Sequence, residues 1–329
     1  MNFGKIKMHH LKYSHLFNRF DCKPNVCMLL PFLLFSLAKG KQYRNDLIRS
    51  YEVNKLSSPP VGISNQNHPT IEILINSTAK DFKYLNAVIN RAVLNSCNEI
   101  GKITIVVPEI ELYNCKHLVL ENIHIKKIEV KSEDSILNNK IVKKIRENFP
   151  GRYGWVLQQF LTIEHVVNSN YLGVLQVNSD TFILRPVLWI DSNGDQPLLV
   201  SSEYNPPYYR LLNKINSKFP VDTYSHITHH MLFQPKILKV IMEKSNLTSV
   251  EQLLDEVIKN YDHKAISPVC VEFELYALGL LAYFPEKAII SKFGNISLNL
   301  QPNLTNVEFE SIINILSKKY NSISMHSYL

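Results

Sequence analysis

The 329-residue sequence predicts an α/β fold in which a mostly parallel central sheet is flanked by helices. Short apolar runs without polar alternation recur along the chain, as expected of strands that are covered on both faces. The clearest of these runs are residues 70–76, 103–107 and 172–177. Segments with apolar residues at helical spacing separate them. Strands that alternate with helices favour parallel pairing and a doubly wound sheet.

The remaining elements follow from the same two patterns. Further strands are expected at residues 118–130, 197–202 and 227–233, and a terminal strand or tail at 322–329. Helices are expected at residues 81–94, 135–149, in the first half of 153–186, and at 236–244, 249–261, 269–283 and 307–320. Residues 55–69 are rich in Ser, Pro and Asn and indicate a linker. The sequence therefore predicts a leader at 1–69 and one folded domain at 70–329.

The positive charge is concentrated in the leader. Residues 1–60 contain ten Lys and Arg against three acidic residues, whereas the rest of the chain has 26 of each sign. A nucleic-acid-binding domain needs a basic face, so the neutral body argues against that class of protein. The five cysteines form no CxxC motif and match no zinc spacing, which favours free thiols in a reducing compartment.

One apolar run, residues 26–38, lies within the basic leader. It is short for a membrane span and contains Pro31. A packed or membrane-surface helix predicts a cytoplasmic protein with peripheral membrane contact. A signal or anchor, supported by a small-x-small site at residues 36–38, instead predicts the lumen of the secretory pathway.

A polar cluster directly follows the strand at 172–177. It contains Asn178, Ser179 and Asp180. Ligands of open α/β sheets bind beyond the carboxyl ends of the strands. An acidic side chain at this position suits a hard divalent cation, with Asn178 adding an oxygen. The alternative is a polar turn in which Asp180 accepts hydrogen bonds from the main chain.

Four further side chains could carry chemistry. His229 and His230 are neighbours on an expected strand, so only one of them can face a given site. Glu272 and Glu274 lie two apart on an expected helix and diverge by about 200°. One of them could act as a general base or bind sugar hydroxyls. The alternatives are core histidines and acids that favour the helix dipole.

Aromatic rings offer a second kind of contact. Tyr204 and Tyr208 lie in a segment at 204–209 that is rich in aromatic residues and proline and is expected to be a loop. These rings and that of Trp155 could stack on the faces of sugars or bases, or they could be core residues.

With these motifs in view, the body resembles a GT-A-type glycosyltransferase. The resemblance rests on the motif at 154–161 (GWVLQQFL), the turn at 178–181 (NSDT), and Arg185 with Pro186. Three downstream segments are similar to a bacterial glycosyltransferase-like family of unknown function, and they contain Tyr204 to Tyr208, Thr228 to Phe233, and Glu272 to Tyr276. A terminal HSY at 326–328 fits as well, and the resemblance covers about residues 70–329.

The resemblance implies the roles of individual residues. Asp180 would be the primary ligand of Mn²⁺ or Mg²⁺, with Asn178 beside it and His326 as a second ligand. Asn178 stands where the family carries an acid, which removes one charge from the metal site. Donor or substrate contacts would come from Trp155, Gln158, Gln159, Ser179, Arg185, Tyr204, Tyr208, His229, His230 and Tyr276. The catalytic base stays open between Glu272 and Glu274.

The expected function is sugar transfer from a nucleotide-diphosphate-sugar donor to a hydroxyl group. The acceptor would be a glycan, a lipid-linked molecule or a small molecule, and polysaccharide biosynthesis is the expected setting. Two alternatives stay open. The first is a nucleotidyltransferase or metal-dependent phosphoesterase, and the second is a sugar- or nucleotide-binding protein without turnover.

Overall fold

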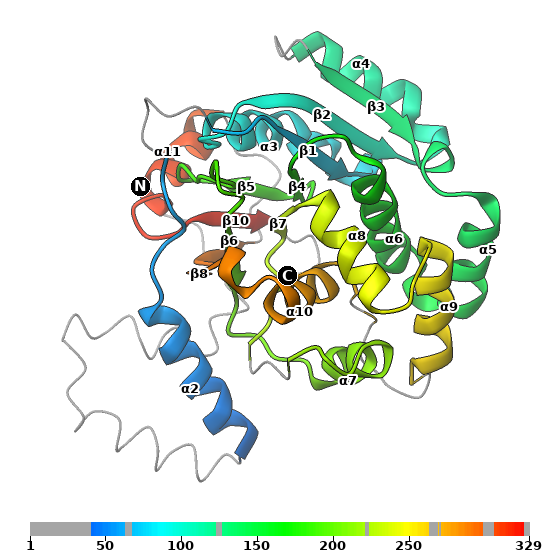
Figure 1. The fold of residues 1–329 in the computed structure, drawn as a ribbon. Helices are drawn as coiled ribbons and strands as arrows, with labels where there is room; N and C mark the ends of the chain where they lie inside the picture. Colours follow the sequence, from blue (N-terminus) through cyan, green and yellow to red (C-terminus); the bar gives the residue numbers. More distant parts are fainter. Residues whose placement is uncertain are drawn as a thin grey trace, which may run out of the picture.

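The structure is a computed structural model that describes residues 41–62, 68–122, 127–220, 224–262, 269, 271–298 and 306–325. Its centre is a five-stranded sheet in the order β3-β2-β1-β4-β7 (Figure 1). The strands are β1 (Ile71–Asn76), β2 (Ile100–Val107), β3 (Ile128–Ser132), β4 (Val174–Val177) and β7 (His230–Phe233). All are parallel except β7, which runs antiparallel to β4. The predicted α/β fold with a mostly parallel sheet is confirmed.

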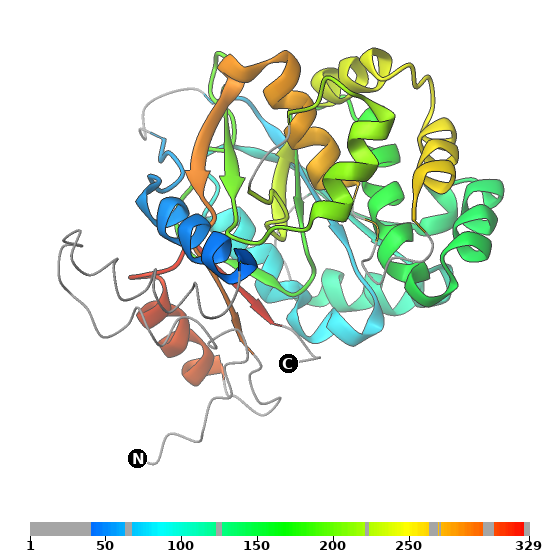
Figure 2. The same ribbon diagram turned by 90° about the horizontal axis from the view of Figure 1, so that it is seen from below.

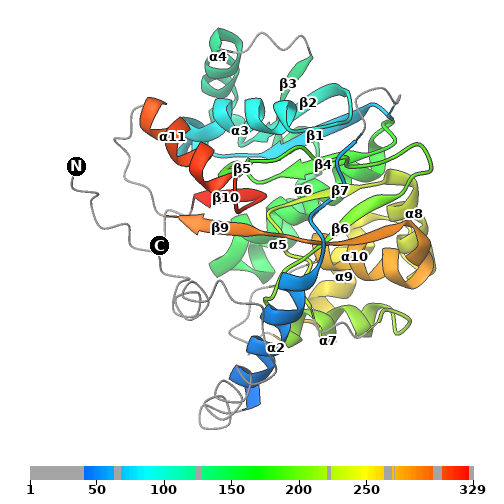
Figure 3. The ribbon, with the colours of Figure 1, turned by 90° about the vertical axis from the view of Figure 1, so that its left-hand side faces the viewer.

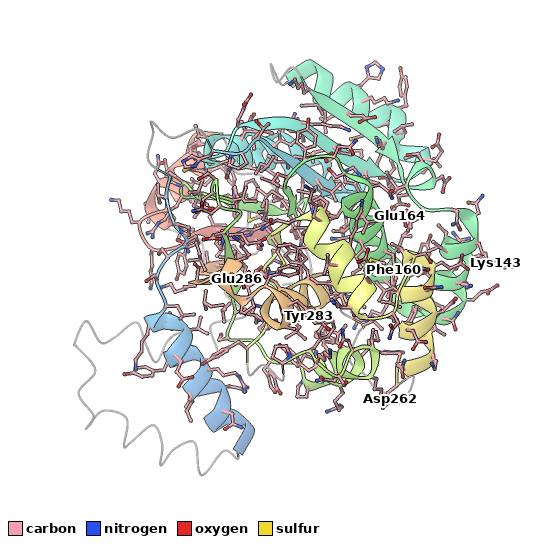
Figure 4. The ribbon with its side chains drawn as sticks, in the orientation of Figure 1. Lys143, Phe160, Glu164, Asp262, Tyr283 and Glu286 are labelled. Carbon is pink, nitrogen blue, oxygen red and sulfur yellow. The ribbon has the colours of Figure 1, made fainter. Side chains whose placement is uncertain are left out.

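Both faces of the sheet are covered. Every residue of β1 and β4 is buried, which explains their uninterrupted apolar sequences. One face packs against α5 (Asn139–Asn148), α6 (Tyr153–Asn168), α7 (Pro206–Ile215), α8 (Pro235–Lys244), α9 (Val250–Asn260) and α10 (Glu272–Tyr283). Phe160 of α6 belongs to this core, and the partly buried Tyr283 of α10 packs against it; both are labelled in Figure 4. The other face packs against α3 (Phe82–Leu94), α4 (Leu112–Asn122) and α11 (Asn306–Leu316).

Two smaller sheets extend the molecule. Strand β10 (Ser322–Met325) lies between β5 (Thr181–Ile183) and β9 (Asn295–Leu298), beside α11 (Figure 3). Strands β6 (Gln196–Val200) and β8 (Ala288–Lys292) form a parallel pair. The predicted terminal strand is confirmed for residues 322–325, and residues 326–329 lie outside the described part.

Three local predictions were wrong. Residues 118–130 are not one strand, because α4 ends at Asn122 and β3 begins at Ile128. The four-residue spacing of the buried Cys115 and Val119 is helical, and short apolar runs do not distinguish helix from strand. The expected loop at 204–209 contains the start of α7, because Pro206 and Pro207 occupy its first turn, where no amide donor is needed. The strand expected at 227–233 begins only at His230.

The described part of the leader forms helix α2 (Lys41–Lys55), which contacts β8 (Figure 2). Arg49 lies over the ring of Tyr204 at 4.6 Å, and Glu52 accepts a hydrogen bond from the Tyr224 hydroxyl. After α2, the Pro60 carbonyl accepts a hydrogen bond from the Leu188 amide. The domain boundary at 69/70 stays a prediction, and residues 41–60 make direct contacts with the body. Among the described helices, none has the length and apolar character needed to span a bilayer.

A buried carboxylate lies at the amino end of the sheet. Glu72 of β1 is 2% exposed and accepts hydrogen bonds from Thr104 at 2.6 Å and Ser169 at 2.8 Å. Its Oε1 also lies 2.9 Å from His165 Nε2 on α6. Burial alone would raise the pKa of Glu72, but the hydrogen bond and charge of His165, with those of Thr104 and Ser169, lower it to about 2.

We expect Glu72→Gln to destabilise the fold at pH 7 by on the order of 3 kcal/mol. The folded pKa lies below the ordinary value, so this contribution is present above about pH 4.5 and is lost as the pH falls through about 2. Urea unfolding of both proteins at pH 7 and at pH 3 measures it, and the difference between them should shrink at the lower pH. An equal difference at both pH values would contradict an ionised Glu72.

Candidate active site

The carboxyl ends of β1 and β4 meet at one edge of the sheet and carry a buried amide cluster. Asn76 ends β1, and its Nδ2 donates to Thr162 Oγ1 of α6 at 2.8 Å. On β4, Gln176 Nε2 donates to Asn178 Oδ1 at 2.9 Å, and Gln158 Nε2 reaches the same oxygen at 3.4 Å. Helix α6 therefore places Gln158 directly beside Asn178.

The turn after β4 is fixed from two sides. Ser179 Oγ donates to Asp81 Oδ2 at 2.8 Å, and the Met325 amide donates to the Asp180 carbonyl at 2.8 Å. Asp180 itself is half-buried. Burial raises the pKa of Asp81, and the nearby charge of Asp180 raises it further, against the hydrogen bond from Ser179. The turn thus brings two acids within electrostatic range of each other at the edge where ligands bind.

These residues meet the requirements of a divalent cation only in part. Asp180 supplies a carboxylate, which is a suitable oxygen ligand. The side-chain oxygen of Asn178 already accepts from Gln158 and Gln176, so it does not suit a metal. The described residues contain no group of three acids, histidines or cysteines placed to hold an ion. The predicted ligand His326 lies outside the described part of the chain.

The two neighbouring histidines have different environments. His229 precedes β7 in a left-handed conformation (φ 59°), and its Nδ1 lies 3.3 Å from Asn178 Nδ2. His230 is fully buried against Trp189 and Phe293. Burial, aided by His229, lowers the pKa of His230 to about 3. The structure brings His229 to the site and places His230 in the core, so only one of the pair faces the cluster.

The two glutamates both lie in the first turn of α10 and are buried. Glu274 Oε1 accepts from Ser225 Oγ at 2.9 Å, the His226 amide at 3.0 Å and the Tyr209 hydroxyl at 3.2 Å. Burial raises the pKa of Glu274 despite these donors. Glu272 is 5% exposed, and no described group hydrogen-bonds its Oε2. Burial raises the pKa of Glu272 to about 8. The Oε2 atoms of both glutamates have no hydrogen-bond partner among the described residues. Glu274 differs in the three donors that hold its Oε1.

Helix α6 connects the start of α10 to the amide cluster. Gln159 Nε2 donates to the Val269 carbonyl at 2.9 Å, and Gln159 Oε1 accepts from the Val271 amide at 2.7 Å. Trp155 Nε1 donates to the same Val269 carbonyl at 2.7 Å, and its ring stays 43% exposed. Gln158 contacts Asn178, and Gln159 holds the segment before Glu272. These two neighbouring residues of α6 therefore connect the amide cluster to the start of α10.

Several predicted contact residues lie elsewhere. The guanidinium of Arg185 donates to the Ser317 carbonyl just after α11, where it caps that helix. The Tyr276 hydroxyl donates to Gln196 at 2.7 Å and accepts from the Gln234 amide at 2.9 Å. Gln234 follows the antiparallel β7, so Tyr276 lies toward the opposite end of the sheet from Asn178. The structure gives both residues structural contacts.

The tyrosines of the expected loop pack against other residues of the protein. Tyr208 is buried in α7. The ring of Tyr204 stacks on that of Tyr209 at 5.1 Å, and Tyr209 contacts Glu274. Tyr204 thus lies near the Glu274 cluster rather than at the carboxyl edge of β4. Proline at the start of a helix, not a flexible loop, fixes these rings.

The sequence reading missed Asn76, Asp81 and Gln176. Asn76 is a polar residue at the carboxyl end of an apolar strand, as Asn178 is. Because ligands of open α/β sheets bind beyond the carboxyl ends of the strands, its position in the sequence could have identified it. Gln176 lies inside the apolar run of β4, where a single amide is an unusual buried group. Asp81 carries no sequence signal of its own, because its partner Ser179 lies 98 residues away.

Three solved glycosyltransferases align with most of this chain. The mannosyltransferase Ktr4p from S. cerevisiae in complex with GDP aligns with 76% of this chain and 79% of its own, at 10% identity and a TM-score of 0.51. Mouse xyloside xylosyltransferase 1 aligns with 79% of this chain and 98% of its own, at 12% identity and a TM-score of 0.42. The galactosyltransferase LgtC, in complex with donor and acceptor sugar analogs, aligns with 77% and 86%, at 12% identity and a TM-score of 0.44.

No family model and no curated protein matches the sequence. The resemblance to a bacterial family of unknown function is therefore not confirmed by any family match. The likeness to Ktr4p shows the fold, which is α/β and GT-A-like.

Proposed function

We propose that this protein is a glycosyltransferase that moves a sugar from a nucleotide-diphosphate-sugar donor to a hydroxyl acceptor. The observation that carries the proposal is the position of Asp180. It follows β4 at the carboxyl edge of a GT-A-like sheet, where open α/β sheets bind ligands. The likeness to the mannosyltransferase Ktr4p, whose structure is a complex with GDP, supports the class of reaction.

The site residues take distinct roles in this proposal. The exposed ring of Trp155 supplies a flat apolar face beside the start of α10, which suits the acceptor sugar. Glu272 is the candidate base or nucleophile, because three donors already hold the carboxyl group of Glu274. Glu274 is a positioning residue for the segment around Ser225 and His226.

A divalent cation, Mn²⁺ or Mg²⁺, is part of the proposal. Asp180 and His326, which follows Met325 in the sequence, would hold it, and Asn178 would not be a ligand. When bound, such an ion neutralises charge that develops on the leaving diphosphate. The basic leader supports peripheral contact with an anionic membrane surface in a cytoplasmic enzyme with lipid-linked acceptors.

The test is product analysis with UDP- and GDP-sugars, with and without sugar acceptors and Mn²⁺. Sugar transfer breaks the bond between the sugar and the diphosphate, so the expected product is UDP or GDP and a glycosylated acceptor. Release of UMP or GMP with a sugar phosphate would instead identify a phosphoesterase, and transfer of the UMP or GMP group to an acceptor would identify a nucleotidyltransferase. Saturable nucleotide binding without any product would identify a non-catalytic binding protein.

A further inference from the structure

Asn178 and His229 are joined by two hydrogen bonds. The Asn178 amide donates to the His229 carbonyl at 2.8 Å, and the Asn178 Nδ2 faces His229 Nδ1 at 3.3 Å. The main chain of His229 is left-handed, a conformation that few residues with a side chain adopt. The two bonds therefore hold both the backbone and the ring of His229 against the turn that follows β4.

The amide cluster fixes the orientation of the Asn178 side chain. Its Oδ1 accepts from Gln176 Nε2 and Gln158 Nε2, and this leaves its Nδ2 facing the imidazole. Reversing these amides would place Gln176 Nε2 where its Oε1 now lies, and that oxygen has no hydrogen-bond partner among the described residues. Gln176 is 1% exposed, and a buried N–H without an acceptor is rarer than a carbonyl without a donor. The observed orientation is therefore favoured.

We propose that Asn178 is a positioning residue that sets the tautomer of His229. An amide nitrogen can only donate, so His229 Nδ1 must accept and carries no proton. The neutral ring then holds its proton on Nε2. Asn178, which stands where the resembled family carries an acid, thus prepares a hydrogen-bond donor on His229 instead of binding a cation.

The consequence for the ligand rests on the proposed function. A fixed Nε2–H group suits the anionic oxygens of a nucleoside diphosphate, because a charge-assisted hydrogen bond is stronger than a neutral one. A carboxylate at position 178 would accept a hydrogen bond from Nδ1–H, so it would favour the tautomer with its proton on Nδ1 or the charged imidazolium. Asparagine at this position instead keeps the ring neutral, with its proton on Nε2.

The tautomer can be read directly from two-bond ¹⁵N–¹H correlation spectra of protein labelled in its 12 histidines. His229→Gln identifies the resonances of His229 by their loss. At pH 8 without ligand, we expect wild-type His229 to show the Nε2–H pattern. We expect Asn178→Asp to give the Nδ1–H or imidazolium pattern, and the exposed Asn170→Asp to leave it unchanged. An Nδ1–H or charged His229 in the wild type would overturn the proposal, even where no variant folds.

Titration with UDP and GDP distinguishes a failure of this proposal from a failure of the proposed glycosyltransferase function. Metal-free diphosphate should shift the His229 Nε2 resonance, and Asn178→Asp should weaken its apparent affinity by about 10-fold or more. Diphosphate that binds without moving this resonance would overturn the donor role. An Nε2–H tautomer that stays the same in Asn178→Asp would overturn the positioning role. A protein that shows the tautomer but binds no diphosphate and turns over no sugar donor would instead refute the proposed function.

Discussion

Asp180→Asn should lower the rate of sugar transfer by about 100-fold or more. The substitution keeps the shape of the side chain but removes the negative charge that would hold the cation beside the leaving diphosphate. The main-chain carbonyl, which accepts from Met325, is unchanged, so the turn and β10 should keep their contacts. The measurement is the initial rate of UDP or GDP release with a fixed acceptor, together with Mn²⁺ affinity by calorimetry.

The exposed Asp134→Asn is the matched control, because it removes the same charge from a short 3-10 helix outside the site. It should leave both the rate and the Mn²⁺ affinity unchanged. Both variants should unfold within about 0.5 kcal/mol of the wild type. A fully active Asp180→Asn protein would remove Asp180 from the site.

Glu272→Gln should also lower the transfer rate by about 100-fold or more, since an amide cannot accept a proton or attack a sugar carbon. The pKa of Glu272 is raised to about 8, so the wild-type rate should rise with pH and level off above that value. The rate of the variant should lack this inflection. A pH–rate series of both proteins measures the effect.

The stability of the wild-type protein should fall as the pH rises, whereas its transfer rate increases. The folded pKa lies above the unfolded value, so folded Glu272 retains a proton that the unfolded chain loses between about pH 4.5 and 8. The wild type therefore loses stability as the pH rises through this range, and Glu272→Gln does not. Thermal unfolding should show a variant that is more stable at pH 8 and equal at pH 4.

Two companion variants decide which glutamate acts. Glu274→Gln keeps an oxygen for Ser225 and His226, so it should retain most of the transfer rate. Glu286→Gln changes an exposed residue of the short 3-10 helix after α10, labelled in Figure 4, and should have no effect. An inactive Glu274→Gln beside an active Glu272→Gln would reverse the assignment.

The sheet could be predicted because its signal is local. Strands β1, β2 and β4 are covered on both faces, and the sequence of each shows it without help from distant residues. The same argument located Asp180, since a polar turn after an apolar strand is visible in the sequence. Helix α7 was missed because the aromatic residues of the segment suggested a binding loop, while the two prolines that start the helix were not used.

The roles of individual side chains depended on contacts that no spacing reveals. Arg185 was expected at the ligand, yet its acceptor is a carbonyl 132 residues later. Asn178 was expected to bind a metal, and only its neighbours Gln158 and Gln176 show that its oxygen is already used. Glu272 and Glu274 could not be ranked from the sequence, because the difference lies in the donors that surround Glu274.

The placement of β10 links the site to the order in which the chain is synthesised. This strand is the middle of its sheet and its Met325 amide holds the Asp180 carbonyl, although some 140 residues separate the two segments. While residues 322–325 are still inside the ribosome, β5 cannot pair with β10. The Asp180 carbonyl then also lacks its hydrogen bond from the Met325 amide. Such long-range closure is slow. Prematurely terminated chains should therefore be inactive even where the five-stranded sheet has formed.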